Sequence, residues 1–247
     1  MGCDIHLYVE KRVEGVWISA DKWSDDEYEP GRKQVAYGDR FYTGRNYDLF
    51  AIFADVRNGS GFAGVKTGDG FVPIASPRGL PDDCSAEVRA ESEAWEGDGH
   101  SHSFLTVTDI QTYDWTQQTR KVGHVDPYGW ARWRDRGAPE EWCGMVSGAD
   151  IRYLPKETFE AAWERVRDAA GYPANRYASA HLRPLSGGKN PDMDAFIREI
   201  GGGSPYCEVE WGVSYVEAGA GFLGSTLPKL WRLGAADDVR VVFWFDN

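Results

Sequence analysis

Two of the chain's five histidines and two serines lie within one short stretch, DGHSHSFL at residues 98–105. The next residues, Thr106 and Asp109, are typical of a helix N-cap and its supporting acid. Imidazole and hydroxyl groups just before a helix can be aimed at a ligand to which the first helical N–H groups also point. We therefore consider His100 and Ser101 as candidate catalytic residues. Adjacent residues seldom point at each other, however, and no G-x-S-x-G motif surrounds the serine.

A second pair of reactive side chains belongs to a predicted strand at the N-terminus. Residues 3–10 alternate between apolar and polar, which predicts a strand with one buried face, and residues 16–19 complete a hairpin. Asp4 and His6 then project from the same face, about 6.5–7 Å apart along the strand. Such a pair can bind a metal or orient a general base, while a solvated polar face explains it equally well.

Three arginines stand out because each lies beside turn residues: Arg45, Arg57 and Arg78. Two prolines stiffen the turn PRGLP at residues 77–81, so Arg78 is expected to be held rigidly, as suits capture of a carboxylate or phosphate. A surface arginine in a tight turn is the alternative. Arg57 follows a predicted helix, where it would also complement the helix dipole.

The composition limits the classes of partner. With 39 acidic against 27 basic residues, the net charge of −12 argues against binding to duplex nucleic acid. No apolar run approaches membrane-spanning length and no secretory signal is visible, so we expect no membrane partner and a cytoplasmic setting. The four cysteines lack C-x-x-C spacing and are expected to be reduced. Eleven tryptophans suit core packing, a ligand face or a homo-oligomer interface.

The hydrophobic periodicity predicts an α+β fold in one domain, residues 1–247. We expect a mainly antiparallel sheet that contains the N-terminal hairpin and the apolar strand at 239–247, with a further strand at 207–215. Helices are predicted at 46–56, 85–95, 107–115, 155–170, 190–200 and 227–233. The helices at 46–56 and 155–170 are expected to pack on the sheet, whereas residues 22–44 are predicted to form a long loop.

Five segments together resemble a widespread family of uncharacterised bacteriophage proteins: MGCDIH, RNYDLFAIFADVRN, PRGLP, DGHSHSFL and VRVVFWFDN. The family has no assigned reaction. The resemblance implies a phage-encoded protein that acts in the cytoplasm of the infected host cell, with a variable helical and loop insertion at about 118–200. Its recurring motifs contain Asp4, His6, Arg57, Asn58, Arg78, His100 and Ser101.

These residues are compatible with an enzyme. Asp4 and His6 would face a pocket completed by His100 and Ser101, and together supply the acid, base or nucleophile of a hydrolase or phosphodiesterase. Arg57, Asn58 and Arg78 would hold a small anionic, nucleotide-like ligand at the rim. A divalent metal could be bound by Asp4, His6, His100 and His102, although nothing in the spacing requires these segments to meet.

Two other functions fit the same residues. A non-catalytic protein could sequester the anionic ligand and so counter host defence signalling, as some phage accessory proteins do. A virion or assembly protein without a pocket would explain the aromatic content but not the paired histidines.

Overall fold

The computed structural model describes residues 2–58, 65–66, 71–95, 97–185 and 187–246. Within these ranges the chain has an α+β fold, which confirms the predicted fold class. The chain divides into two compact units. Unit 1 comprises residues 1–58, 69–117 and 214–247, and unit 2 comprises residues 59–68 and 118–213. Unit 2 therefore contains most of the stretch predicted as an insertion, and the single domain stays a prediction.

Unit 1 is built on an antiparallel sheet of four strands in the order β2-β1-β10-β6. The strands are β2 (Val16–Ser19), β1 (Ile5–Val13), β10 (Val239–Phe245) and β6 (His100–Thr106). The N-terminal hairpin and the C-terminal strand thus share one sheet, as predicted. Every residue of β10 is buried, because both faces of this central strand are covered.

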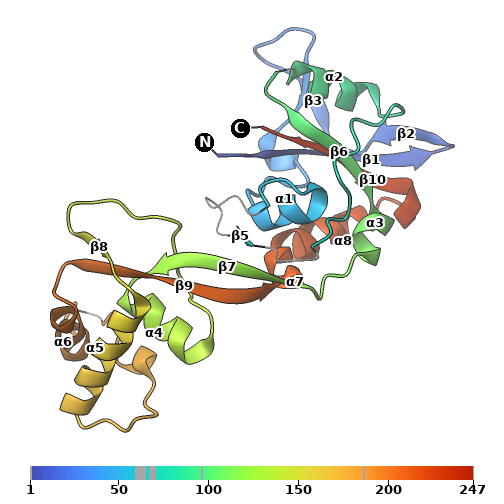
Figure 1. Cartoon of the computed structure of the whole chain (residues 1–247). Helices are drawn as coiled ribbons and strands as arrows, with labels where there is room; N and C mark the ends of the chain where they lie inside the picture. The colour runs from blue at the N-terminus through green and yellow to red at the C-terminus, as the bar shows by residue number, and fades with distance from the viewer. Residues whose placement is uncertain (1, 59–64, 67–70, 96, 186, 247) are drawn as a thin grey trace. The chain divides into compact units, whose positions relative to one another are not determined.

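Helices cover both faces of this sheet (Figure 1). On one face α1 (Tyr47–Ala54) and α8 (Leu227–Leu230) share a core with Phe243 and Phe245 of β10. On the other face α2 (Ala86–Ala94) contributes Val88 to a cluster with Val242 and Trp244. The alternation of side chains along β10 therefore separates two cores.

The start of α1 follows directly from its sequence. The side chain of Asn46 accepts a hydrogen bond from the Leu49 N–H at 3.1 Å, which caps the first turn. Asp55 is the C-cap of the helix and has a left-handed φ of 58°. The predicted helix is confirmed, with α1 ending at Ala54.

Residues 22–44 are not wholly a loop as predicted. Strands β3 (Trp23–Asp25) and β4 (Lys33–Val35) pair antiparallel within this stretch, with Trp23 opposite Val35. Two strands of three residues are too short to show a hydrophobic period. Unit 1 also contains α3 (Val107–Thr112) and α7 (Tyr215–Ala218).

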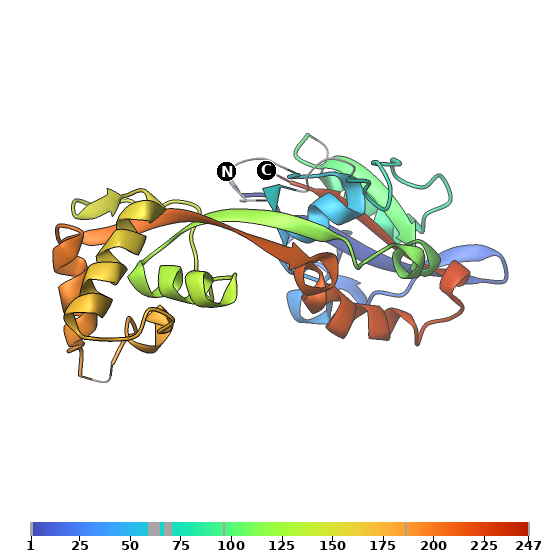
Figure 2. The same cartoon turned by 60° about the horizontal axis from the view of Figure 1, so that its bottom comes forward.

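Unit 2 has its own sheet and its own core. Its strands follow the order β5-β7-β9-β8: β5 (Val65–Lys66), β7 (Gln118–Val125), β9 (Ser204–Ser214) and β8 (Ile151–Tyr153). In the described part of unit 2 the α-helices are α4 (Pro127–Arg136), α5 (Lys156–Ala169) and α6 (Pro191–Glu199), of which α5 and α6 lie side by side (Figures 1 and 2).

The prediction that the helix at 155–170 packs on the terminal sheet is wrong. Its apolar stripe, which includes Phe159 and Trp163, lies in the core of unit 2 with Phe196 of α6 and Trp211 of β9. An amphipathic pattern identifies the buried face of a helix but not the surface it contacts. None of the helices in the described ranges has both the length and the apolar character needed to cross a bilayer.

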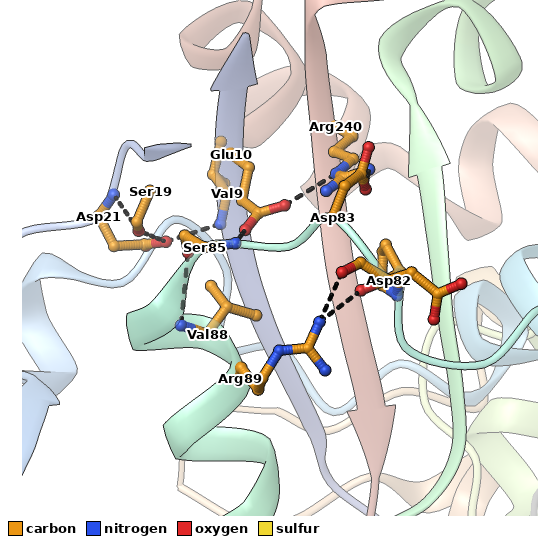
Figure 3. Close-up of polar contacts among 11 residues, drawn as sticks. Val9, Glu10, Ser19, Asp21, Asp82, Asp83, Ser85, Val88, Arg89 and Arg240 are labelled. Carbon is orange, nitrogen blue, oxygen red and sulfur yellow. Dashed lines mark hydrogen bonds and ion pairs between the residues drawn. The ribbon is translucent and has the colours of Figure 1, made fainter. Parts of the chain in front are cut away.

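A buried ion pair links the two central strands of unit 1 (Figure 3). Arg240 of β10 donates from Nε to Oε2 of Glu10 on β1 at 2.8 Å, and both side chains are almost fully buried. Oε1 of Glu10 accepts the Ser85 N–H at 2.6 Å, and Arg240 also contacts Asp83 at 2.8 Å. This network therefore anchors the segment before α2 to the sheet.

Candidate functional site

The two ends of the chain meet at one end of the unit 1 sheet, where the N and C labels lie together in both views (Figures 1 and 2). The Asp4 N–H donates to Oδ1 of Asp246 at 2.8 Å, and the Asp246 N–H donates to the Asp4 carbonyl at 3.2 Å. The other carboxylate oxygen of Asp246 lies 3.1 Å from Nε2 of His6. We call the region formed by Asp4, His6 and Asp246, together with the start of β6, the sheet end.

Asp246 is the site residue that the sequence analysis missed. It follows the apolar strand at the C-terminus, and an antiparallel pairing of that strand with residues 3–10 would have placed it beside Asp4 and His6. The carboxylate orients the His6 ring, an arrangement that general bases share.

Arg45 holds Asp4 in a two-point contact. Its Nε lies 2.7 Å from Oδ1 of Asp4, and its terminal nitrogen lies 2.5 Å from Oδ2. The guanidinium lowers the pKa of Asp4 below its usual value. Both side chains are about half exposed, 53% for Arg45 and 49% for Asp4. The sequence singles out Arg45 but does not assign it to the site.

Arg57 reaches the sheet end on the face covered by α1. Its guanidinium lies 5.8 Å from the centre of the Tyr47 ring, and the Tyr47 hydroxyl accepts the Cys3 N–H at 3.1 Å. Burial raises the pKa of the Cys3 thiol, and the neighbouring Arg57 only partly offsets this effect. The thiol is therefore neutral near pH 7 and is a poor nucleophile. Asn58 donates from its amide to Asp55 at 2.7 Å.

His6 and His100 do not share a pocket, so that part of the predicted site is wrong. The His6 ring lies against Trp95 at 4.0 Å and stacks near Trp244 at 5.9 Å, on the α2 face of the sheet. His100 is paired across the strands with Phe245 and lies 6.1 Å from its ring, on the α1 face. Cross-strand partners share a face, so the two histidines lie on opposite sides of β10.

A β-bulge causes this separation. The register between β10 and β6 shifts between Phe243 and Phe245, and Ser101 has a left-handed φ of 53°. His102 keeps the regular register and stacks on Trp244 at 5.3 Å on the α2 face, whereas the one extra residue in β6 turns His100 to the α1 face. His100 and Ser101 do contact each other, with Nδ1 3.0 Å from Oγ.

Two buried imidazole nitrogens at the sheet end, besides Nε1 of the neighbouring Trp244, have no hydrogen-bond partner in the described part of the chain. They are Nδ1 of His6 and Nε2 of His100. Buried polar atoms are nearly always paired in folded proteins. These two nitrogens are therefore candidates for a contact with a ligand or for proton transfer. Burial, followed by the nearby His100, lowers the pKa of His102.

The guanidinium of Arg78 lies away from the sheet end. It donates to the carboxylate of Asp109 at 2.9 Å and to the Phe104 carbonyl at 3.2 Å. Phe104 is four residues along β6 from His100, about 13 Å at the usual rise of a strand. The predicted place of Arg78 at the rim is therefore wrong: the side chain stabilises the capping box of α3, which uses Asp109.

The predicted metal ligands do not form a set either. No group of three or more histidine, cysteine, aspartate or glutamate side chains suited to a metal occurs among the described residues. Both carboxylate oxygens of Asp4 contact Arg45. His6 and His102 lie on the opposite face of the sheet from His100. Comparison with protein-family models, with curated proteins and with solved structures finds no match to this chain.

Proposed function

We propose that this protein is phage-encoded, acts in the cytoplasm of the infected cell and binds a small anionic, nucleotide-like ligand at the sheet end. The ligand would be held by Arg45 and Arg57. The observation that carries the proposal is the half-exposed, two-point contact between Arg45 and Asp4. The family resemblance of the sequence supports the phage origin.

The Arg45–Asp4 pair is of a kind that a phosphate can replace. Ion pairs between exposed side chains contribute only about 0–1 kcal/mol, so little free energy resists exchange. A phosphate offers the same two-point geometry as a carboxylate and carries more charge. Arg57 adds a second positive charge near this pair, because its guanidinium lies 5.8 Å from the ring of Tyr47, whose hydroxyl accepts the N–H of Cys3, the residue before Asp4.

Hydrolysis of the ligand is the second candidate function, and the His6–Asp246 pair favours it. If Asp246 accepts the Nε2–H of His6, the other ring nitrogen is left as a base. That atom, Nδ1, is buried against the face that carries Trp95. Catalysis would therefore require Trp95 or the ring to move before Nδ1 could take a proton from water.

A binding and turnover assay tests both candidates. The purified protein is incubated with linear and cyclic mono- and dinucleotides, with and without Mg²⁺, and the retained and released compounds are measured by mass spectrometry. A compound that is retained unchanged supports a protein that sequesters the ligand and so counters host defence signalling. A compound that is converted supports a hydrolase. If no compound is retained or changed, the proposal is wrong and a virion or assembly role takes its place.

Matched variants locate the site. Arg45→Gln removes a charge-assisted contact worth about 1.5–3 kcal/mol, so affinity should fall about tenfold or more. Arg12→Gln is the control, because Arg12 forms a similarly exposed pair with Asp238 in the same unit, with exposures of 42% and 40%. Equal losses in the two variants would contradict a site at Arg45. His6→Gln should abolish turnover and leave most of the binding.

A further inference from the structure

Unit 2 contains a cavity of about 320 Å³ that none of the predicted site residues lines. It lies among the end of β7, the start of α4 and residues 140–146. Small-molecule sites occupy about 300–1,000 Å³, so this cavity suits a compact ligand. Three aromatic side chains line it: Tyr128, Trp142 and Tyr206.

Two glycines allow the wall at residues 141–143 to approach closely. A Cβ at Gly123 would lie 2.5 Å from Cε3 of Trp142, and a Cβ at Gly129 would lie 3.2 Å from the Glu141 carbonyl. The wall is also tied to β7 by a pair of backbone hydrogen bonds between His124 and Cys143, at 2.8 and 3.0 Å. The wall at residues 141–143 therefore packs closely against the backbone of β7 and α4.

The hydrogen bond made by His124 determines what its ring can offer. Nδ1 of His124 lies 2.9 Å from the carbonyl oxygen of Gly144. Because a carbonyl can only accept, Nδ1 carries the hydrogen, and Nε2 of the neutral ring is an acceptor. His124 thus contributes an acceptor to a lining that already contains several.

The charges that line the cavity are predominantly negative. Three carboxylates, Asp126, Glu140 and Glu141, are present with one arginine, Arg132. The arginine is already ion-paired with Glu140. Asp126 uses one oxygen to accept the Gly129 N–H at 2.7 Å, and no such contact engages Glu141 in the described part of the chain.

Two further polar groups of the cavity, the Tyr206 hydroxyl and the Cys143 thiol, add no negative charge. Burial raises the pKa of Tyr206 above its usual value, and Asp126 adds to the effect. Burial likewise raises the pKa of the Cys143 thiol, which lies 3.4 Å from the His124 carbonyl oxygen. Neither group supplies a negative charge near pH 7, so the excess charge of the cavity comes from the carboxylates.

We propose that this cavity binds a small organic cation rich in N–H donors, such as an amidine or guanidinium attached to a flat apolar group. Carboxylates bind such cations through paired N–H donors, and the aromatic rings attract the positive charge. This is a second site of opposite charge preference, in a different unit from the proposed anion site.

Benzamidine is a suitable probe, with benzamide and benzoate as its neutral and anionic counterparts. Titration calorimetry of the full chain should show benzamidine binding at least tenfold more tightly than benzamide, with no measurable binding of benzoate. Equal affinity for benzamidine and benzamide, tighter binding of benzoate, or no binding of benzamidine would each overturn the proposal.

Two comparisons place the probe in the cavity. Glu141→Gln should weaken benzamidine binding about tenfold, whereas Glu164→Gln, on the exposed side of α5 in the same unit, should leave it unchanged. In proton–carbon NMR spectra, benzamidine should shift the ring signals of His124. The signals of His181, which is engaged by Asp192 at 2.7 Å, should not move. Equal effects of the two variants, or shifts at His181 alone, would contradict the location.

Discussion

Replacing Glu10 by glutamine should destabilise unit 1 strongly, because it leaves the charge of Arg240 buried without its main partner. Glu10 is 0% and Arg240 3% exposed, and the carboxylate accepts hydrogen bonds from both Arg240 and the Ser85 N–H. Breaking a buried ion pair by removing one charge costs about 3–5 kcal/mol. Asp83 and the Trp17 ring, 4.1 Å from the Arg240 guanidinium carbon, still compensate part of the charge. We therefore expect a loss near the lower limit, about 3 kcal/mol.

Urea unfolding followed by circular dichroism measures this loss. The double variant Glu10→Gln/Arg240→Met should be less destabilised than the sum of its single variants, with a coupling of about 2–3 kcal/mol. Arg12→Met is the control: its half-exposed pair with Asp238 should contribute no more than about 1 kcal/mol. A loss below about 1 kcal/mol for Glu10→Gln, or additive single losses, would refute the reasoning.

Three further predictions concern unit 1 and the thiols. Burial raises the pKa of Asp21 to about 6 from an ordinary 3.8, so its charged form opposes folding. As the pH rises from about 4 to 7, the unfolding free energy of the wild-type protein should therefore fall relative to that of Asp21→Asn, by at most about 3 kcal/mol. If urea unfolding gave the same pH dependence for the two proteins, this prediction would be contradicted. Ser101 has a left-handed φ of 53°, so Ser101→Val should be less stable than Ser101→Gly by about 1–2 kcal/mol, and equal melting temperatures would exclude this strain. All four cysteines should titrate as free thiols after denaturation, with Cys84 and Cys143 reacting before the buried Cys3 and Cys207 in the native protein; two or fewer free thiols would disprove a reducing compartment.

Three of the four strands of the unit 1 sheet could be predicted because they carry a local signal, whereas β6 (His100–Thr106) was not predicted as a strand. Alternation at residues 3–10 and the apolar run at 239–245 each identify a strand, and Asn46 identifies the start of α1. No local signal of this kind shows which other element each strand or helix packs against. The stripe of α5 shows that Phe159 and Trp163 are buried, but whether they meet the terminal sheet or β9 depends on packing between distant segments.

The sheet end shows the same limit at the level of single residues. Asp4 and His6 could be assigned to one face of a strand from their spacing alone. Their contact with Asp246 depends on the register between strands at opposite ends of the chain, in which Ile5 lies opposite Phe245. A shift of one residue would turn every side chain to the other face, and no residue type at these positions fixes that register locally.

The position of His100 depends on one backbone angle. In a regular strand His100 and His102 would project from the same face, and both would lie with His6 beside Trp244. The left-handed Ser101 inserts one extra residue, and His100 turns to Phe245 instead. A glycine at this position would have suggested a bulge, but serine gives no such signal. The sequence HSHS therefore indicates which groups are available for chemistry, whereas the conformation of Ser101 decides which of them can act together.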